Sequence, residues 1–420
     1  MRATAILVMG ATLAIGGACS GEEPAAPKPA PNPQIAALGD GQAVKLKING
    51  TPPTGRNYCV RMPYDPVNKV GILYGASHDP ARWLKHLQNE LLVFDASTAT
   101  WTQLTPTDSL NLPTRLTEFG VVVPKEGMLR PPGVGHTYSL NCFDEQIGKF
   151  GSLRGGTPEW LRGWPKPQEV EKMKADAKAG GLEDPEKARR CLPWLFDVKT
   201  KAWSLACPAE GDTPCHARAE AACYDPKHKR VLYWSTDGDV ANRKDGVYAY
   251  DGAANKWTFS VTKGGPAPGI EQLCCWDGVN ERVLYFSGSY VNAKPRQAKS
   301  FDYPSLTWTD LNAGNWPDAP NSDPANKTKR VFCAFQDTLV FEPSAGVAII
   351  FSSDGNVHPY DVRTNAFLPA HKIEGITKGQ LKGYYDPDQR AIILAGVNCE
   401  DYRPMETWAY RYKRAEEKKP

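Results

Sequence analysis

The chain has 420 residues, of which 41% are apolar, and its 12 Trp, 17 Tyr and 13 Phe are enough for a sizeable core, while 37 Gly and 36 Pro imply many turns. This composition favours an all-β fold of short strands. Fifty basic side chains stand against 47 acidic ones, and the resulting formal charge of +3 argues against a nucleic-acid partner.

The first 18 residues have the anatomy of a secretory signal peptide. Arg2 precedes an apolar run, Ala3–Ile15, that is too short for a membrane span, and small residues then lead to Cys19. The stretch Gly16-Gly17-Ala18-Cys19 resembles a bacterial lipobox, although Gly16 stands where Leu is usual. We expect lipidation of Cys19, and plain signal-peptidase cleavage after Ala18 is the alternative.

Residues 19–40 follow as a Pro/Ala-rich segment, with the sequence SGEEPAAPKPAPNP over residues 20–33. Such a segment cannot pack into a core and is typical of an extended tether. Signal and tether together predict a lipoprotein of a bacterial cell envelope, periplasmic or on the outer surface, or otherwise a secreted protein. We expect a monomer that contacts the membrane through its N-terminal lipid only.

The segment Val44–Ile48 alternates apolar and polar residues with the period of a strand. The last repeated unit of the chain ends at Thr407–Tyr412, one strand short of its four. We therefore expect Val44–Ile48 to complete that unit, which would join the two ends of the fold and remove an exposed sheet edge.

The strongest signal in the chain is an internal repeat with two acidic turns in each unit. An Asp that leaves a strand can accept bonds from the backbone N–H groups of the turn, and an aromatic residue six positions later begins the returning strand. This outer turn occurs at Phe94-Asp95, Phe196-Asp197, Tyr250-Asp251, Phe301-Asp302 and Tyr360-Asp361, with the later aromatic at Trp101, Trp203, Trp257, Trp308 and Phe367. An inner acidic turn, followed by a β-rich apolar run, occurs at Tyr64-Asp65, Phe143-Asp144, Tyr224-Asp225, Trp276-Asp277, Phe341-Glu342 and Tyr385-Asp386.

Four-stranded units repeated about every 45 residues are typical of a β-propeller, because a lone unit cannot bury both of its faces. The units resemble blades of the kelch family and of the related central propeller of galactose oxidase, over about residues 55–415. The family's Gly-Gly pair is kept at Gly155-Gly156, and Gly75, Gly288 and Gly396 are single remnants. We predict an all-β fold, a six-bladed kelch-like propeller over residues 41–415 with a charged tail at 416–420. Seven blades would need more strands in residues 106–135, where only Phe119–Val123 is suitable.

Blade two carries the largest insertion, at about residues 157–190. Val170, Met173 and Ala177 space as one face of a helix over residues 167–179, and Asp184-Pro185 is typical of the start of a second short helix. The insertion could cover one side of the channel mouth or decorate the outer rim, and the sequence favours neither.

Ten cysteines remain besides Cys19, in a compartment where disulfides persist. Cys207 and Cys215 flank a turn-rich stretch and are the best local pair. Cys142, Cys223 and Cys275 each lie two residues before an inner-turn Asp, so this recurrence favours packing or bridging between blades. The spacings do not match a zinc site, and we expect no metal and no cofactor.

Loops on one face surround the central channel in kelch-like propellers, and the resemblance implies a ligand site there. Tryptophan and arginine on such loops suit carbohydrate stacking or protein anchoring, whereas the tryptophans of the outer turns indicate blade packing. The candidate binding residues are His78, Arg82, Trp83, Trp160, Arg162, Trp164, Arg243, Tyr290, Arg296, Tyr402 and Arg403.

These features favour an envelope-anchored binding module that recognises a glycan, peptide or protein partner with its loop face. The alternative is a metal-free carbohydrate-active enzyme of the mutarotase or isomerase kind, with Asp79, Glu159 and Glu400 available for acid–base work. A copper radical oxidase is a distant third, because no spacing marks any of the seven His as ligands. A scaffold that uses the outer rim is a further possibility, which an exposed apolar patch there would support.

Overall fold

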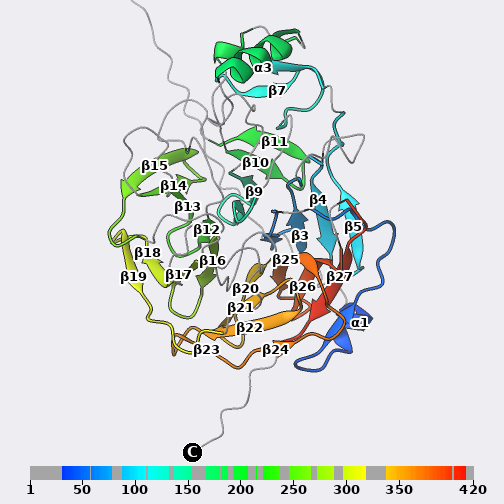
Figure 1. Cartoon of the computed structure of the whole chain (residues 1–420), viewed down its shortest axis with the longest axis vertical. Coiled ribbons are helices and arrows are strands. Elements are labelled where there is room, and N and C mark those ends of the chain that lie inside the picture. Colours follow the sequence, from blue (N-terminus) through cyan, green and yellow to red (C-terminus); the bar gives the residue numbers. More distant parts are fainter. Residues whose placement is uncertain are drawn as a thin grey trace, which may run out of the picture.

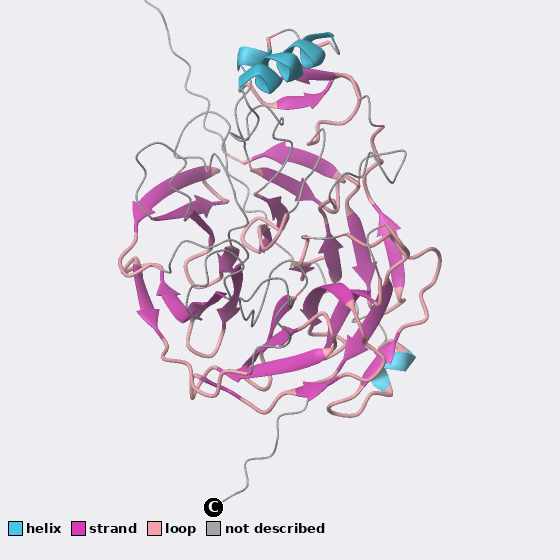
Figure 2. Cartoon of the chain, in the orientation of Figure 1, coloured by secondary structure: helices cyan, strands magenta, loops and turns pink. Residues whose placement is uncertain are grey.

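The computed structural model describes residues 31–56, 58–77, 88–109, 112–131, 137–153, 167–179, 181–182, 184–187, 193–206, 214, 221–235, 246–265, 272–287, 297–317, 337–399 and 402–412. Within these residues, six antiparallel sheets surround one central axis (Figure 1, Figure 2). The predicted six-bladed β-propeller is therefore confirmed.

Each blade runs from an innermost strand at the axis to an outermost strand at the rim. The strands of blades one to three are β2 Tyr64–Asp65, β3 Val70–Leu73, β4 Leu92–Asp95 and β5 Thr100–Gln103; β8 Asn141–Asp144, β9 Lys149–Ser152, β10 Trp194–Asp197 and β11 Ala202–Leu205; and β12 Ala222–Asp225, β13 Arg230–Ser235, β14 Gly246–Asp251 and β15 Lys256–Val261. Those of blades four to six are β16 Gln272–Asp277, β17 Arg282–Ser287, β18 Gln297–Asp302 and β19 Thr307–Asp310; β20 Thr338–Glu342, β21 Val347–Phe351, β22 Asn356–Asp361, β23 Ala366–Phe367 and β24 His371–Lys372; and β25 Gly379–Asp386, β26 Ala391–Val397 and β27 Glu406–Tyr410.

The outermost strand of blade six comes from the N-terminal part of the chain. Strand β1, Ala43–Lys45, pairs antiparallel with β27, so that Ala43 lies opposite Tyr410. Before β1, the one-turn helix α1, Pro33–Ala36, buries Ile35 against blades six and one. The first and last described segments thus share one sheet, and β27 has no free edge.

The inner turns join the first two strands of every blade, and their acidic residues are buried, with 0–5% of each side chain exposed. Each carboxylate accepts N–H groups two or three residues later, as Asp65 does from Val67 and Asn68 at 2.9 Å each. The residue four positions after each acid has a φ of 51–65°, a conformation that Gly148 and Gly346 adopt without strain. The repeated Asp or Glu therefore fixes the same turn six times in the described chain.

The outer turns join the third and fourth strands and end in the predicted aromatic residues. Asp95 accepts the N–H of Ser97 at 2.8 Å, and Asp302 accepts that of Ser305 at 3.1 Å. The tryptophans after these turns are buried between blades, as their packing role predicts: Trp101, Trp203, Trp257 and Trp308 are 1–9% exposed. Both kinds of turn lie at one end of the blades, which we call the turn face.

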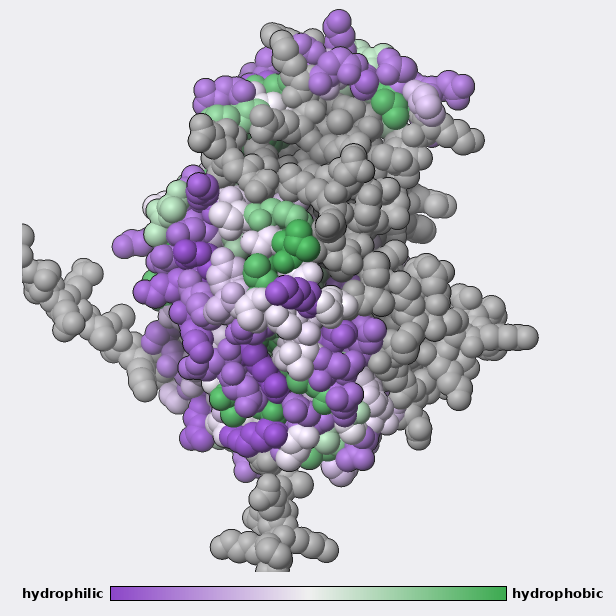
Figure 3. All heavy atoms as spheres, turned by 90° about the vertical axis from the view of Figure 1, so that its left-hand side faces the viewer, coloured by the Kyte–Doolittle hydropathy of each residue, from purple (hydrophilic) through white to green (hydrophobic). Residues whose placement is uncertain are grey.

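Six buried apolar clusters lie between neighbouring blades in the described structure. The cluster between blades one and two, for example, joins Tyr74 and Val93 to Phe150 and Trp203. Because each blade supplies half of two clusters, the blades stabilise one another around the ring. The outer surface of blades three and four is mainly hydrophilic, with small apolar areas (Figure 3).

The central axis is filled by the segment 53–63, which precedes β2. Arg56, Cys59, Val60 and Met62 are at most 2% exposed. Val60 accepts a 2.7 Å hydrogen bond from Thr338 of blade five, and Arg61 forms a parallel bridge with Gly383 of blade six. The described axis is therefore a packed core and not an open channel.

Two further elements lie outside the ring. Strands β6, Thr114–Leu116, and β7, Val122–Pro124, pair with each other and with no other described strand, so residues 114–124 form a hairpin between blades one and two and not a seventh blade. The helix α3, Pro167–Ala179, has the predicted bounds, and η2, Pro185–Lys187, follows as a 3-10 turn. In the face-on view, α3 lies beyond the rim of blade two (Figure 1), so it decorates the rim and does not cover the axis.

Candidate functional site

Most of the residues predicted for a loop-face site lie outside the described residues. They are His78, Arg82, Trp83, Trp160, Arg162, Trp164, Arg243, Tyr290 and Arg296, together with the lipidation candidate Cys19 and the cysteine pair Cys207 and Cys215.

Two predicted residues, Tyr402 and Arg403, are described, and both lie beside the axial segment. Tyr402 has a φ of 64° and donates its N–H to the carbonyl of Gly55 at 3.1 Å. The carbonyl of Arg403 accepts the N–H of Gly55 at 2.7 Å, and the Arg403 side chain is exposed. These contacts hold the β26–β27 loop against the point where the axial segment enters the ring.

The described loop-side end of blade one contains buried charges that are paired. Arg56 lies next to Glu90 and donates to the carbonyl of Gly75 at 2.7 Å. Arg130 makes a forked contact with Asp108, which also accepts from Asn89. Because each charge has a partner, this network is best explained as support for the loops.

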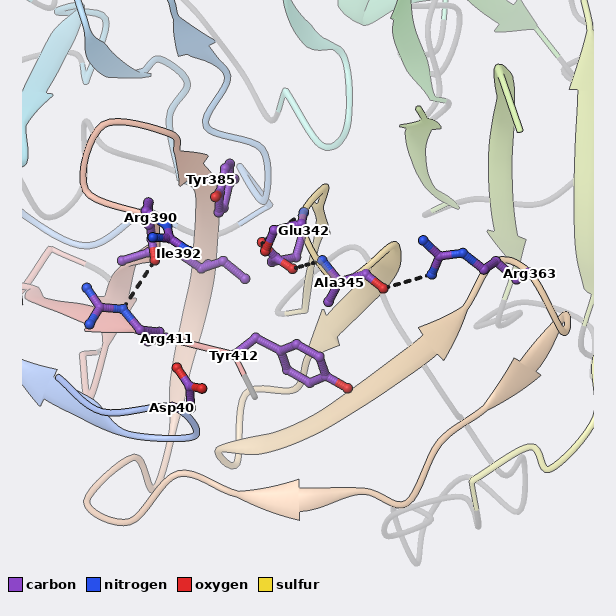
Figure 4. A pocket seen from close by; sticks show the side chains of 11 residues that line it. Asp40, Glu342, Ala345, Arg363, Tyr385, Arg390, Ile392, Arg411 and Tyr412 are labelled. Atoms are coloured by element: carbon purple, nitrogen blue, oxygen red, sulfur yellow. Dashed lines mark hydrogen bonds between the residues drawn. The ribbon is translucent and has the colours of Figure 1, made fainter. Parts of the chain in front are cut away.

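A concave, solvent-accessible site lies on the turn face between blades five and six. It has a volume of about 560 Å³, which is within the range of small-ligand pockets. Side chains from separate turns and from the N-terminal segment line it (Figure 4). The lining residues are Asp40, Glu342, Ser344, Ala345, Arg363, Tyr385, Arg390, Ala391, Ile392, Arg411 and Tyr412.

Arg363 reaches this pocket from the outer turn of blade five. Its Nη1 donates to the carbonyl of Ala345 at 3.0 Å, and the rest of the side chain is exposed. A Cβ at Gly346 would lie 2.5 Å from this Nη1, so the glycine provides the space in which the guanidinium lies. The inner turn of blade five therefore orients Arg363.

Arg390 and Arg411 enter from blade six. Arg390 ends the inner turn with a φ of 51°, and its exposed guanidinium has no hydrogen bond or ion pair with any described residue. Arg411 instead binds protein carbonyls, those of Ile35 at 3.1 Å and of Gln389 and Arg390 at 3.4 Å. Arg390 and Arg363 are thus the cations available to a ligand, and Arg411 anchors the N-terminal segment.

The acidic and aromatic residues of the pocket have distinct roles. Glu342 accepts hydrogen bonds from the Ser344 hydroxyl and the Ala345 N–H, both at 2.6 Å. Its carboxylate is therefore hydrogen-bonded within its own inner turn. Burial raises the pKa of Tyr385, the nearby Glu342 carboxylate raises it further, and the Arg390 charge acts in the opposite direction. Tyr385 therefore stays a neutral hydroxyl beside Arg390, and Tyr412 adds a second aromatic ring (Figure 4).

No protein-family model matches this chain, and no curated protein matches it. Among the described helices, none is long and apolar enough to cross a membrane. The His, Cys, Asp and Glu side chains of the described ranges form no group of three or more that could hold a metal ion.

This pocket lies on the face opposite to the loops that the sequence marks as a candidate site. Asp40, Glu342, Arg363, Arg390 and Arg411 are up to 371 positions apart, and they meet only because blade six neighbours blade five and pairs with β1. The available signal was that blades five and six each have an arginine in an acidic turn, at Arg363 and Arg390. That signal gives no indication that the two side chains face one cavity.

Proposed function

We propose that the protein is a binding module of the bacterial envelope that holds an anionic group of its ligand in the pocket between blades five and six. The observation that carries the proposal is that two exposed arginines from neighbouring blades, Arg363 and Arg390, line one concave site, at opposite sides of the pocket in Figure 4. Guanidinium groups pair with carboxylates in a forked geometry, and Tyr385 and Tyr412 offer aromatic surface for a sugar ring. An acidic glycan is the ligand class that best matches this combination.

The kelch-like family, the export signal and lipidation at Cys19 belong to the same proposal. The acidic inner turns and the four-stranded blades support the kelch assignment, and the sequence of residues 1–33 supports the tether. The loop-face residues Trp83 and Trp160 remain our candidates for a second contact with the partner. A lipid-anchored ring with polar pockets and aromatic loops suits recognition at a cell surface.

Binding of uronic-acid oligosaccharides, measured by calorimetry at low and high salt, tests the pocket. We expect the double substitution Arg363→Ala with Arg390→Ala to weaken binding at least tenfold, and added salt to weaken the wild type. Lys201→Ala is the matched control, because Lys201 is an exposed cation at a positive-φ turn position of blade two.

Parallel measurements with Trp83→Ala and Trp160→Ala separate the two faces. If both tryptophan variants bind with wild-type affinity and the double arginine variant binds more weakly, the result supports the turn-face pocket. The reverse pattern would assign binding to the loop face, and equal binding of neutral and acidic sugars would contradict the anionic preference.

A further inference from the structure

Two buried cysteines face each other between blades three and four. Cys223 lies on β12 and Cys274 on β16, the innermost strands of these neighbouring blades. Both side chains belong to the single apolar cluster between the two blades, and they are 1% and 3% exposed. Successive residues of a strand point to opposite faces, so Cys275 lies instead in the cluster between blades four and five.

The contacts of Cys274 cross from its own blade to the next. Its Sγ lies 3.0 Å from the carbonyl oxygen of Ala222, the residue directly before Cys223. Arg61 of the axial segment donates from Nη1 both to this carbonyl and to Cys274 Sγ, the latter at 3.4 Å. Arg61 and the Ala222 carbonyl therefore hold the Cys274 thiol beside β12.

The other described cysteines have contacts near their own position in the chain. Cys142 donates to Gly151 of its own blade at 3.8 Å, Cys399 to Gly396 at 3.2 Å, and Cys59 to Ala76 at 3.7 Å. The hydrogen bond of Cys274 with the Ala222 carbonyl, in contrast, joins two neighbouring blades.

The two thiols also differ in how readily they lose a proton. The hydrogen bond with Cys274, together with burial, raises the pKa of Cys223 well above its ordinary value. Burial of Cys274 acts in the same direction, but the hydrogen bond from Cys223 and the charge of Arg61 outweigh it and lower the pKa of Cys274. Cys274 is thus the nucleophile of the pair, because a thiolate and not a thiol attacks a disulfide.

We propose that Cys223 and Cys274 are a redox-active pair that forms a disulfide between the innermost strands of blades three and four. The oxidant is a disulfide, either of a protein dithiol oxidase or of a small molecule, and it reacts before blades three and four have packed together, because both thiols are buried in the fold. The Cys274 thiolate attacks one sulfur of the oxidant and releases a thiolate, which gives a mixed disulfide. Cys223 then loses its proton and attacks Cys274 Sγ, and the second thiolate of the oxidant leaves. The two cysteines are oxidised by two electrons, the oxidant is reduced to two thiols, and the S–S bond replaces both S–H bonds.

The test is peptide mapping of the full-length protein without a reducing agent. The protein is refolded with glutathione disulfide, its free thiols are blocked with iodoacetamide under denaturing conditions, and it is digested with trypsin. We expect the peptide of residues 219–227 joined to that of residues 264–282, two hydrogen atoms lighter than the reduced pair, with one alkylated cysteine. Fragmentation should place the alkyl group on Cys275.

Neighbouring cysteines provide matched controls. Cys275→Ala should keep the joined peptides, whereas Cys274→Ala and Cys223→Ala should abolish them. Loss of the cross-link, which closes a long loop, should lower Tm by about 5 °C for a domain of this size. Reduction should lower the Tm of the wild type by the same amount. Reduction should also lower the Tm of Cys275→Ala, in addition to any effect of the substitution itself.

Other outcomes contradict the pair. Full alkylation of Cys223 and Cys274 after oxidation would show that the two thiols do not react. A bond between Cys274 and Cys275 within the peptide of residues 264–282, or a bond from Cys223 to Cys142, would show that a different pair forms.

Discussion

At the scale of single residues, the inner-turn carboxylates are alike in sequence but differ in environment. Asp225 pairs its second oxygen with His228 Nδ1 at 2.7 Å. The second oxygen of Asp144 is buried without a hydrogen-bond partner among the described residues, and burial raises the pKa of Asp144 to about 6. The charge of the inner turn of blade two therefore changes with pH near 6.

The pH dependence of stability should report this difference. A carboxyl whose pKa is higher in the folded than in the unfolded protein stabilises the fold at low pH, and this contribution is lost as the pH rises through 6. Relative to wild type, Asp144→Asn should therefore gain about 2–3 kcal/mol in its free energy of unfolding between pH 4 and pH 7.5. Urea unfolding at several pH values measures the difference.

Asp225→Asn is the matched substitution in the inner turn of blade three, where the carboxylate contacts His228. A constant difference between wild type and Asp144→Asn would mean that the pKa of Asp144 is the same in the folded and the unfolded protein.

Gly75 lies beside the axial segment, where an added methyl group should destabilise the fold. A Cβ there would lie 2.3 Å from Cys59 Sγ and 2.7 Å from Thr137 Oγ1, and the φ of Gly75 is +135°. Gly75→Ala should destabilise the fold by about 2–4 kcal/mol, because it combines overpacking at the axis with backbone strain.

Gly50→Ala separates these two effects, since Gly50 has a φ of +89° and no atom within 4 Å of the added Cβ. We expect a loss of about 1 kcal/mol for this variant. Equal losses for both, measured by chemical unfolding, would show that the contact with Cys59 contributes nothing.

At the scale of elements, the parts predictable from sequence are those with a local pattern. The acidic turns, the aromatic residue after each outer turn and helix 167–179 all follow from residues within one turn or one helical face. The axial segment has no such pattern. Residues 53–63 contain no alternation and no repeat motif, and their burial depends on the other blades.

The N-terminal segment is the element whose attachment rests most on one side chain. Arg411 donates to the carbonyls of Ile35 and Gln389. A hydrogen bond from a charged group contributes about 1.5–3 kcal/mol to stability. Arg411→Ala should raise hydrogen exchange of residues 32–46 at least tenfold, as measured by mass spectrometry.

Arg363→Ala is the control for the N-terminal segment, because the Arg363 side chain hydrogen-bonds the Ala345 carbonyl in blade five and not the segment 32–46. Unchanged exchange of residues 32–46 in Arg411→Ala would show that apolar contacts of Ile35 and Leu46 hold the segment without the guanidinium.

At the scale of the whole molecule, the attachment of residue 32 sets the orientation of the ring. Two hydrogen bonds fix the position of Asn32 on the turn face. Its N–H donates to the Gln389 side chain at 2.9 Å, and its side-chain amide donates to the Ala96 carbonyl at 3.1 Å. Twelve peptide steps separate Cys19 from residue 31, a reach of at most about 40 Å. If Cys19 carries the lipid as proposed, the turn face points toward the membrane.

Fluorescence quenching on vesicles tests this orientation. A dye attached through a non-natural residue at Val67, which is 69% exposed on the turn face, should be quenched by labelled lipid headgroups more strongly than a dye at Arg403 on the opposite face. Cys19→Ser should abolish quenching at both positions. Equal quenching in the lipidated protein, or stronger quenching at Arg403, would contradict the orientation.

The filled axis has a consequence for the order in which the protein folds. Val60 bonds a residue 278 positions later, and the Arg56 carbonyl accepts from Lys382, 326 positions later. During synthesis this segment leaves the ribosome long before its partners, and contacts of such sequence separation form slowly. The ring therefore cannot complete its folding blade by blade during synthesis. Its core is complete only when the last blade exists, which suits the proposed export, because an exported chain crosses the membrane unfolded and folds afterwards.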